Sequence, residues 1–102
     1  MNTETTKTGL KFDAGKPMME LMPPNAELAV VRVLTFGAGK YGPDNWRELD
    51  NLYPRYLGAA RRHLNALQRG EACDPETGEH HLAHAVCCLM FILEDELLER
   101  QS

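Results

Sequence analysis

The sequence predicts an all-α fold of three main helices with an irregular N-terminal arm, completed by oligomerisation. No segment alternates apolar and polar residues in the way that a half-buried strand does. Apolar residues instead recur at helical spacing in three segments, at about residues 25–36, 52–69 and 79–100. The centre of the third segment, residues 83–93, is apolar on nearly all sides. Two other helices cannot cover such a helix completely, and we therefore expect a homo-oligomer.

The bulk composition describes one small globular domain. The chain has 102 residues, of which 43% are hydrophobic and 25% are charged. Its formal charge of −4 argues against general nucleic-acid binding, which depends on Lys and Arg neutralising phosphates. The longest nearly apolar stretch, residues 82–93, is well short of the ~20 residues that cross a bilayer. The N-terminus has no apolar signal core, so we expect a cytoplasmic protein without a membrane partner.

The chain should begin with a flexible polar tail at residues 1–9 and an extended arm at residues 10–24. The arm contains three prolines, each of which biases the preceding residue away from helix. Its apolar side chains should pack on the body of the domain or on a neighbouring subunit. They are Met18, Met19, Leu21 and Met22.

The first helix should start with Asn25 as its cap, directly after two prolines. Three glycines, Gly37, Gly39 and Gly42, should end it. The segment from residue 37 to 47 resembles a phosphate-binding glycine loop only superficially, because it lacks the glycine-lysine-serine/threonine ending. We expect Trp46, in this segment, to pack into the core.

Lys40 and Asn45, in the same segment, are equally compatible with a structural and a ligand-binding role.

The second helix should run from about Leu52 to Arg69 and the third from about Glu79 to Arg100. Residues 74–78 between them have the composition of a turn. The two helices should therefore pack antiparallel. The three cysteines include no pair two residues apart, so we expect reduced thiols, with Cys87 and Cys88 as small core residues.

An antiparallel hairpin brings all four histidines near one end. Three of them, His80, His81 and His84, fall within five residues, and His63 lies on the opposite helix. The connector carries four carboxylates, including Glu71 and Asp74. This combination suits a divalent metal ion or a phosphorylated ligand.

Each of these side chains also has a structural alternative. A lone histidine can be hydrogen-bonded in the core or solvated, and an aspartate before proline is a common turn residue. Arg55 and Arg62 can bind phosphate oxygens through their guanidinium groups, or they can form exposed ion pairs with Glu76 or Glu79.

Seven segments, in this order, resemble a family of small phage proteins named after the N-terminal domain of dATP/dGTP diphosphohydrolases. The resemblance covers about residues 9–93. It implies hydrolysis of a purine deoxynucleoside triphosphate to the monophosphate and pyrophosphate, and it implies ten matching residues as site candidates. The segments are Asp13–Pro17, Phe36–Gly42, Asn45–Arg47, Arg62–Leu64, Gly70–Glu71, Asp74 and His81–Ala85. The candidates are Lys16, Lys40, Tyr41, Asn45, Arg62, His63, Glu71, Asp74, His81 and His84.

The sequence departs from another group of all-α pyrophosphohydrolases, those that resemble MazG. Those enzymes hold Mg²⁺ with closely spaced glutamates on a helix, whereas the corresponding helix here reads Arg61-Arg62-His63. This departure keeps a second hypothesis open. In it the chain is a non-catalytic nucleotide-binding phage protein, such as a sponge for a cyclic-nucleotide or other immune signal.

The leading hypothesis is a metal-dependent dNTP diphosphohydrolase. Glu71 and Asp74 would hold Mg²⁺ or Mn²⁺. The histidines would supply ligation or a general base, since an imidazole can take a proton near neutral pH. Of these, His84 should face inward and contact His63, Glu71 or Asp74. The expected catalytic residues are His63, His81 and His84, and the expected substrate-binding residues are Lys16, Lys40, Tyr41, Asn45, Arg55 and Arg62.

Overall fold

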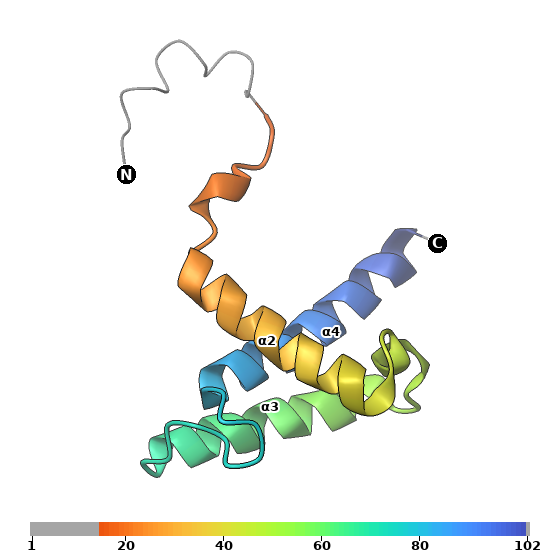
Figure 1. Cartoon of the computed structure of the whole chain (residues 1–102). Coiled ribbons are helices and arrows are strands. Elements are labelled where there is room, and N and C mark those ends of the chain that lie inside the picture. The colour runs from red at the N-terminus through yellow and green to blue at the C-terminus, as the bar shows by residue number, and fades with distance from the viewer. Residues whose placement is uncertain (1–14, 102) are drawn as a thin grey trace, which may run out of the picture.

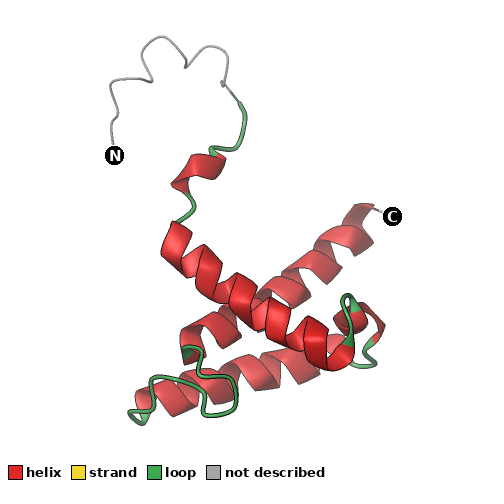
Figure 2. Ribbon diagram, in the orientation of Figure 1, coloured by secondary structure: helices red, strands yellow, loops and turns green. Residues whose placement is uncertain are grey.

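The computed structural model of the chain describes residues 15–101, and the side chains of residues 15–99. Over this range the protein is all-α, as expected, with three long helices, two short 3₁₀ helices and no strand; Figure 2 shows helices joined by loops. The expected tail at residues 1–9 and the first part of the arm, residues 10–14, lie outside the described residues.

Helix α2 (Pro24–Tyr41) is longer than the sequence indicates. It begins at Pro24, whose fixed φ and missing N–H suit the first helical position. Gly37 and Gly39 lie inside the helix, so the expectation that they end it was wrong. A glycine inside a helix lowers the stability of that helix by only ~1 kcal/mol relative to alanine. The chain leaves the helix at Gly42, whose φ of 94° is unfavourable for other residues.

Helices α3 (Leu52–Gln68) and α4 (His81–Gln101) have nearly the expected limits. They form a hairpin in which α4 returns along α3 (Figure 1). Helix α2 crosses α4 on another side, and the short helix η2 (Asn45–Glu48) also contacts α4. Helix α4 is therefore the element that α2, α3 and η2 all contact.

Small side chains line the contacts of α4. Val30, Val33, Ala83 and Cys87 are buried where α2 crosses α4, and Ala60, Ala85 and Cys88 are buried between α3 and α4. The expectation that Cys87 and Cys88 are core residues is confirmed. Burial raises the pKa of the Cys87 thiol to about 12 and that of Cys88 to about 11, because it disfavours the thiolate.

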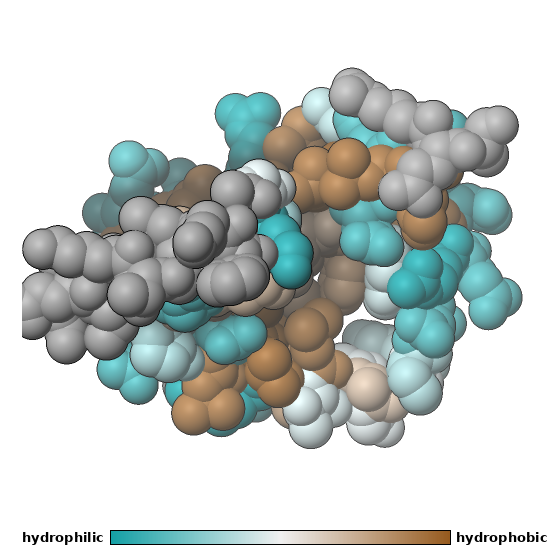
Figure 3. All heavy atoms as spheres, turned by 90° about the horizontal axis from the view of Figure 1, so that it is seen from above, coloured by the Kyte–Doolittle hydropathy of each residue, from teal (hydrophilic) through white to brown (hydrophobic). Residues whose placement is uncertain are grey.

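Much apolar surface stays in contact with solvent. No large side chain of the described residues is fully buried, and Figure 3 shows hydrophobic atoms on the face of the molecule seen from above. The radius of gyration is 16.9 Å, against about 13 Å for a compact domain of 100 residues.

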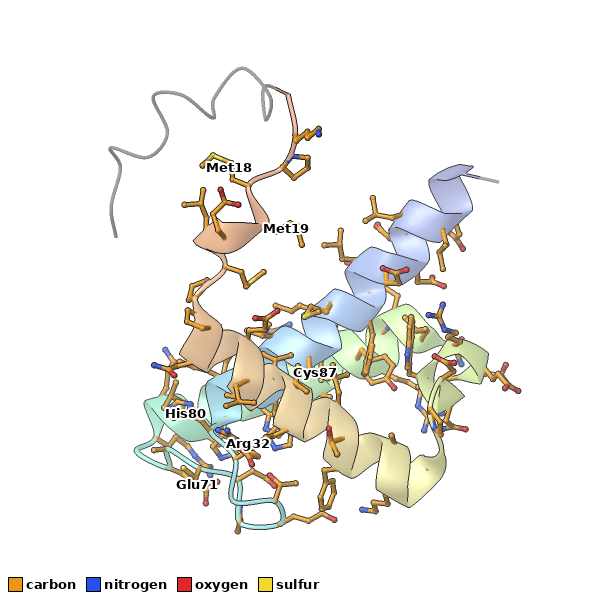
Figure 4. All side chains as sticks on the ribbon, turned by 45° about the horizontal axis from the view of Figure 1, so that its top comes forward. Met18, Met19, Arg32, Glu71, His80 and Cys87 are labelled. Carbon is orange, nitrogen blue, oxygen red and sulfur yellow. The ribbon has the colours of Figure 1, made fainter. Side chains whose placement is uncertain are left out.

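The arm projects from the start of α2 and contains the 3₁₀ helix η1 (Met19–Leu21). Its apolar side chains do not pack on the body: Met19 is 76% exposed, and Met18 stands beside it away from the three helices (Figure 4). Of the two positions expected for the arm, packing on its own domain is therefore wrong.

None of the helices in the described range is both long and apolar enough to cross a membrane.

Candidate functional site

The connector between α3 and α4 is a structured turn that closes the helical hairpin. Gly70 and Gly78 have positive φ values of 100° and 77°, where the chain reverses. Backbone hydrogen bonds join Asp74 N–H to the Glu79 carbonyl at 2.8 Å and His81 N–H to the Ala72 carbonyl at 2.9 Å. The turn expected at residues 74–78 is thus confirmed, and it fixes the carboxylates of the connector against the first turn of α4.

Three imidazoles meet at this end of the hairpin. Nδ1 of His63, from α3, lies 2.8 Å from Nδ1 of His81, from α4. The ring of His84, one turn further along α4, stacks on the His63 ring with 4.5 Å between centroids and 9° between planes. His81 is the only buried polar residue among those described, at 3% exposure, while His63 and His84 are half-buried.

The two connector carboxylates contact different parts of this histidine cluster. Oε1 of Glu71 lies 2.8 Å from Nε2 of His81, on the edge of the ring away from His63. Oδ2 of Asp74 accepts the backbone N–H groups of Glu76 and Thr77 at 3.1 Å each. These bonds form a turn that aims Asp74 at the histidines.

One ligand atom from each of His63, Asp74 and His81 lies within 4.8 Å of the other two. This is the cluster within the described residues that could hold a metal ion, and it does not include Glu71.

The surroundings set the charge states of two members of the cluster. Burial, together with the neighbouring His84 and His81, lowers the pKa of His63 below its usual 6.5. Burial by itself would raise the pKa of Asp74, but the Thr77 N–H and the nearby His84 more than offset it, and the pKa is lowered from 3.8. At neutral pH the cluster therefore contains an ionised Asp74 beside a neutral His63 with a free lone pair.

Thr77 links Asp74 to His84, a role that sequence reasoning did not assign. Its hydroxyl oxygen lies 2.7 Å from Nε2 of His84 and 3.3 Å from Oδ2 of Asp74, and it accepts the Glu79 N–H. His84 does face inward and contact His63, as expected, and its Nε2 lies 3.9 Å from Asp74. The spacing Asp-x-x-Thr in the connector is a signal that could have identified Thr77.

A pocket of about 670 Å³ opens beside the histidine cluster. The end of α2 and helix η2 supply Lys40, Tyr41, Asn45 and Trp46 to its wall, while His84 lies at its border with the cluster. A cavity of this size can enclose a nucleotide-sized ligand. The pocket and the histidine cluster are thus continuous, through His84 and the adjacent Thr77.

Aromatic rings form one side of the pocket. Trp46 stacks on Phe91 of α4 with 4.6 Å between centroids and 15° between planes. The Cζ atom of Arg47 lies 4.6 Å from the centroid of the Trp46 ring. The ring of Tyr56, from α3, also packs on Phe91, with 5.0 Å between the ring centroids. Trp46 was expected to pack into the core; it stacks on Phe91 at the edge of the core but stays half-buried, and the same stack gives the pocket a flat apolar wall.

Lys40 joins the end of α2 to the connector. Its ammonium lies 2.7 Å from Oε2 of Glu76 and 5.2 Å from the centroid of the Tyr41 ring. The hydrogen bonds to Glu76 and Tyr41 raise the pKa of Lys40, so it is a cation at the mouth of the pocket.

The structure separates the expected site residues into three groups. The connector and hairpin bring together His63, His81, His84, Glu71 and Asp74. The pocket contains three of the six expected substrate-binding residues, Lys40, Tyr41 and Asn45. The other three are exposed and lie outside the pocket wall: Lys16, Arg55 and Arg62.

The alternative in which Arg55 or Arg62 pairs with Glu76 or Glu79 is wrong. Glu79 pairs with Arg32 of α2 at 3.0 Å, and Glu76 pairs with Lys40. Glu76 and Glu79 reach toward α2 and not toward the arginines of α3, and Figure 4 shows Glu71 and His80 on the same side of the molecule as Arg32. Sequence spacing cannot reveal this, because α2 contacts the connector only through the tertiary fold.

Comparison with known proteins gives one family and one curated relative. The model of the family described as "dATP/dGTP diphosphohydrolase, N-terminal" matches residues 6–102. A protein of Salmonella phage PMBT28 named dATP/dGTP diphosphohydrolase is 46% identical over 85 residues. The match covers 83% of this chain but 29% of that protein, so the chain spans less than a third of the relative's length. No solved structure matches the chain.

Proposed function

The chain belongs to the family of dATP/dGTP diphosphohydrolase N-terminal domains, and from this premise we propose that it binds purine deoxynucleoside triphosphates and hydrolyses them to the monophosphate and pyrophosphate. The name of the Salmonella phage relative supports this substrate class. The reaction would take place in the cytoplasm of the phage host.

The observation that carries the proposal is the continuity of the pocket with the histidine cluster. The Trp46–Phe91 stack offers an apolar wall for a base. Lys40 and Arg47 provide cations for phosphate oxygens along the same pocket, and Asn45 provides an amide. A nucleotide placed with its base on the aromatic wall extends its phosphates toward His84, Thr77 and the adjacent carboxylates.

The chain's own residues can position the substrate and an ion. The pKa of His63 is held below 6.5, so its imidazole is neutral at working pH and offers a ring nitrogen to the histidine–carboxylate cluster. Thr77 fixes the ring of His84 at the border of the pocket through its hydroxyl. A divalent ion bound at the histidine–carboxylate cluster would neutralise phosphate charge and help to ionise water.

The test is an assay of the purified protein with each of the four dNTPs and Mn²⁺, in which pyrophosphate and dNMP are measured separately. We expect release from dATP and dGTP that exceeds release from the pyrimidine nucleotides. His84→Ala should abolish the activity and leave most of the helicity seen by circular dichroism. If no dNTP yields pyrophosphate, the hydrolase proposal fails.

A second candidate function is nucleotide binding without catalysis, as in a phage sponge for an immune signal. It is favoured by the composition of α3, which carries no Asp or Glu over its whole length, whereas pyrophosphohydrolases that resemble MazG hold Mg²⁺ with glutamates on the corresponding helix. The aromatic wall of the pocket needs no metal to bind a base.

Thermal-shift measurements with cyclic and linear nucleotides in EDTA separate the two functions. A large stabilisation with the ligand recovered intact supports the sponge. A requirement for a divalent ion supports the hydrolase.

We also propose that the chain self-associates. Five exposed apolar residues follow one another along α4 at spacings of three and four, which is the pattern of a helix–helix seam. A second copy is the occupant that fits best, because an unbroken apolar seam on one helix can pair with itself around a two-fold axis without burying a charge. The seam consists of Leu82, Val86, Leu89, Leu93 and Leu97.

A further inference from the structure

We propose that His63, His81 and Asp74 form a binding site for a divalent transition-metal ion, and that Glu71 acts behind it as the residue that orients His81. The hydrogen-bond partners of the four side chains lead to this assignment. Its role in catalysis rests on the proposed function, but the metal site itself does not.

The first step concerns the proton on His81. A carboxylate group only accepts hydrogen bonds, so Nε2 of His81, 2.8 Å from Oε1 of Glu71, carries the hydrogen of that bond. Nδ1 of His81 then carries a lone pair and is the acceptor in the 2.8 Å contact with Nδ1 of His63. A buried imidazole with a carboxylate on one nitrogen and a lone pair on the other is the arrangement that histidine ligands of metals adopt in proteins.

The second step concerns the distance between the two Nδ1 atoms. Two nitrogens that each lie ~2.1 Å from one ion are about 3 Å apart when the angle between them is near 90°. The observed 2.8 Å is close to that value. In the ion-free protein, His63 donates its Nδ1 hydrogen to His81. Binding of an ion requires that His63 carry its hydrogen on Nε2 instead, and that the two rings turn slightly so that both Nδ1 lone pairs face the ion.

The third step concerns Asp74. The turn around it uses Oδ2, which accepts bonds from Glu76 N–H, Thr77 N–H and the Thr77 hydroxyl. Oδ1 accepts no hydrogen bond from the described residues and is therefore available to an ion. One oxygen of this carboxylate lies within 4.8 Å of a ring nitrogen of each of His63 and His81. The turn thus holds the carboxylate in place without using both of its oxygens.

The donor set determines the kind of ion. Two imidazoles and one carboxylate suit ions such as Co²⁺, Fe²⁺, Zn²⁺ and, more weakly, Mn²⁺, whereas Mg²⁺ prefers oxygen ligands alone. The three protein ligands leave positions open for water or phosphate oxygens. Glu71 contacts Nε2 of His81, on the opposite edge of the ring from Nδ1. It is therefore not placed to bind the same ion.

The test is a titration of the full chain with Co²⁺ alone, followed by its visible absorption bands and by isothermal calorimetry. We expect one Co²⁺ per chain, weaker binding of Mn²⁺, and no binding of Mg²⁺ at the same concentration. His81→Ala and Asp74→Asn should each weaken Co²⁺ binding at least tenfold. Nδ1 of the adjacent His80 accepts the Leu82 N–H at 2.9 Å, a bond that an asparagine oxygen can also accept. His80→Asn should therefore bind Co²⁺ as the wild type does.

Glu71 is tested by a pair of variants. Glu71→Ala should weaken Co²⁺ binding about 10–100-fold, as expected for the outer partner of a histidine ligand. Glu71→Gln keeps an oxygen that accepts the Nε2 hydrogen and should restore most of the affinity. If Glu71→Gln is as weak as Glu71→Ala, Glu71 is itself a ligand and the positioning role is overturned.

Nuclear magnetic resonance of the ¹⁵N-labelled histidines gives a readout that is independent of activity. In the ion-free protein, His81 should have its hydrogen on Nε2, and Zn²⁺ should shift the ¹⁵N resonances of Nδ1 of His63 and of His81.

The proposal is overturned if Co²⁺ does not bind, or if His81→Ala and Asp74→Asn, both shown to be folded by circular dichroism, bind it normally. Co²⁺ binding in the absence of nucleotide, without any dNTP hydrolysis, would keep the metal site and remove the hydrolase function. Hydrolysis of a dNTP by His81→Ala in the presence of Mg²⁺ would keep the hydrolase function and show that it does not need this metal site.

Discussion

The hydroxyl of Thr77 contacts both the carboxylate of Asp74 and the imidazole of His84. It accepts the Glu79 N–H and lies between His84 and Asp74, so that a change at this position affects both the turn and the histidine cluster. Because these contacts join the connector to α4, Thr77 affects the stability of the hairpin as well as the geometry of the candidate site.

Thr77→Val keeps the shape of the side chain but leaves Nε2 of His84 without its partner. We expect a loss of about 1–3 kcal/mol in the free energy of unfolding, which is the cost of an unpaired, partly buried polar group. Urea denaturation at pH 7.5 measures it. Thr77→Ser, which keeps the hydroxyl, is the control and should lose much less; equal losses in both variants would show that the methyl group matters instead.

The three thiols should differ in reactivity. Cys73 is exposed, while Cys87 and Cys88 are buried with pKa values raised to about 12 and about 11. An aromatic disulfide reagent at pH 8 should therefore label one thiol per native chain quickly and all three in denaturant. Rapid labelling of two or three thiols in the native protein would contradict the packing of α4.

The same pKa shifts predict a loss of stability at high pH. Well below pH 9, the ordinary pKa of a thiol, both thiols are protonated in the folded and the unfolded chain, so they contribute no pH dependence. As the pH rises from 9 towards 11, the unfolded chain ionises first, and the free energy of unfolding falls. A double variant, Cys87→Ala with Cys88→Ala, should show a flatter decline over this interval in denaturant melts.

Helix α2 carries the pocket residues because it continues through two glycines. Gly37 and Gly39 lie within it, which places Lys40 and Tyr41 on its last turn and at the pocket, rather than in a loop. Packing of Val30 and Val33 against α4 offsets the low helix propensity of the two glycines. Local composition therefore gave the wrong end of this helix.

Two alanine substitutions on α2 should have opposite effects. A Cβ at Gly39 meets nothing within 4 Å, and the residue is helical, so Gly39→Ala should stabilise the protein by about 0.5–1 kcal/mol. Gly42 has a φ of 94°, so Gly42→Ala should destabilise it by about 1–3 kcal/mol although the space is open. Thermal melts of both variants check this, and stabilisation by Gly42→Ala would refute the assigned helix end.

The sequence predicts the elements of this protein better than their contacts. Periodic apolar residues located α3 and α4 almost to the residue, and an antiparallel hairpin then had to bring His63 close to His81 and His84. The pocket depends instead on the crossing of α2 over α4, which no spacing encodes. Spacing therefore could not tell that Lys40, Tyr41 and Asn45 line the pocket while Lys16, Arg55 and Arg62 lie outside its wall.

The three helices together leave an apolar seam that a single chain does not cover. Leu89, in the middle of the seam, is 45% exposed. We expect light scattering to give the mass of at least two chains at micromolar concentration, and Leu89→Asp to give one. Leu64, on α3, is a similarly exposed leucine off the seam, so Leu64→Asp should leave the mass unchanged. A wild-type monomer would contradict self-association and leave the seam to a different partner.

The central claim is that the histidine cluster and the pocket form one site, in which a metal ion meets the phosphates of a nucleotide. Pulsed electron paramagnetic resonance of Mn²⁺ bound with a non-hydrolysable α,β-methylene analogue of dGTP tests this directly. The account predicts that one ion couples both to imidazole ¹⁴N and to nucleotide ³¹P, and that His81→Ala removes the ¹⁴N coupling. An ion that couples to imidazole but never to phosphorus, with the nucleotide saturating, would show that the two features are separate and contradict the account.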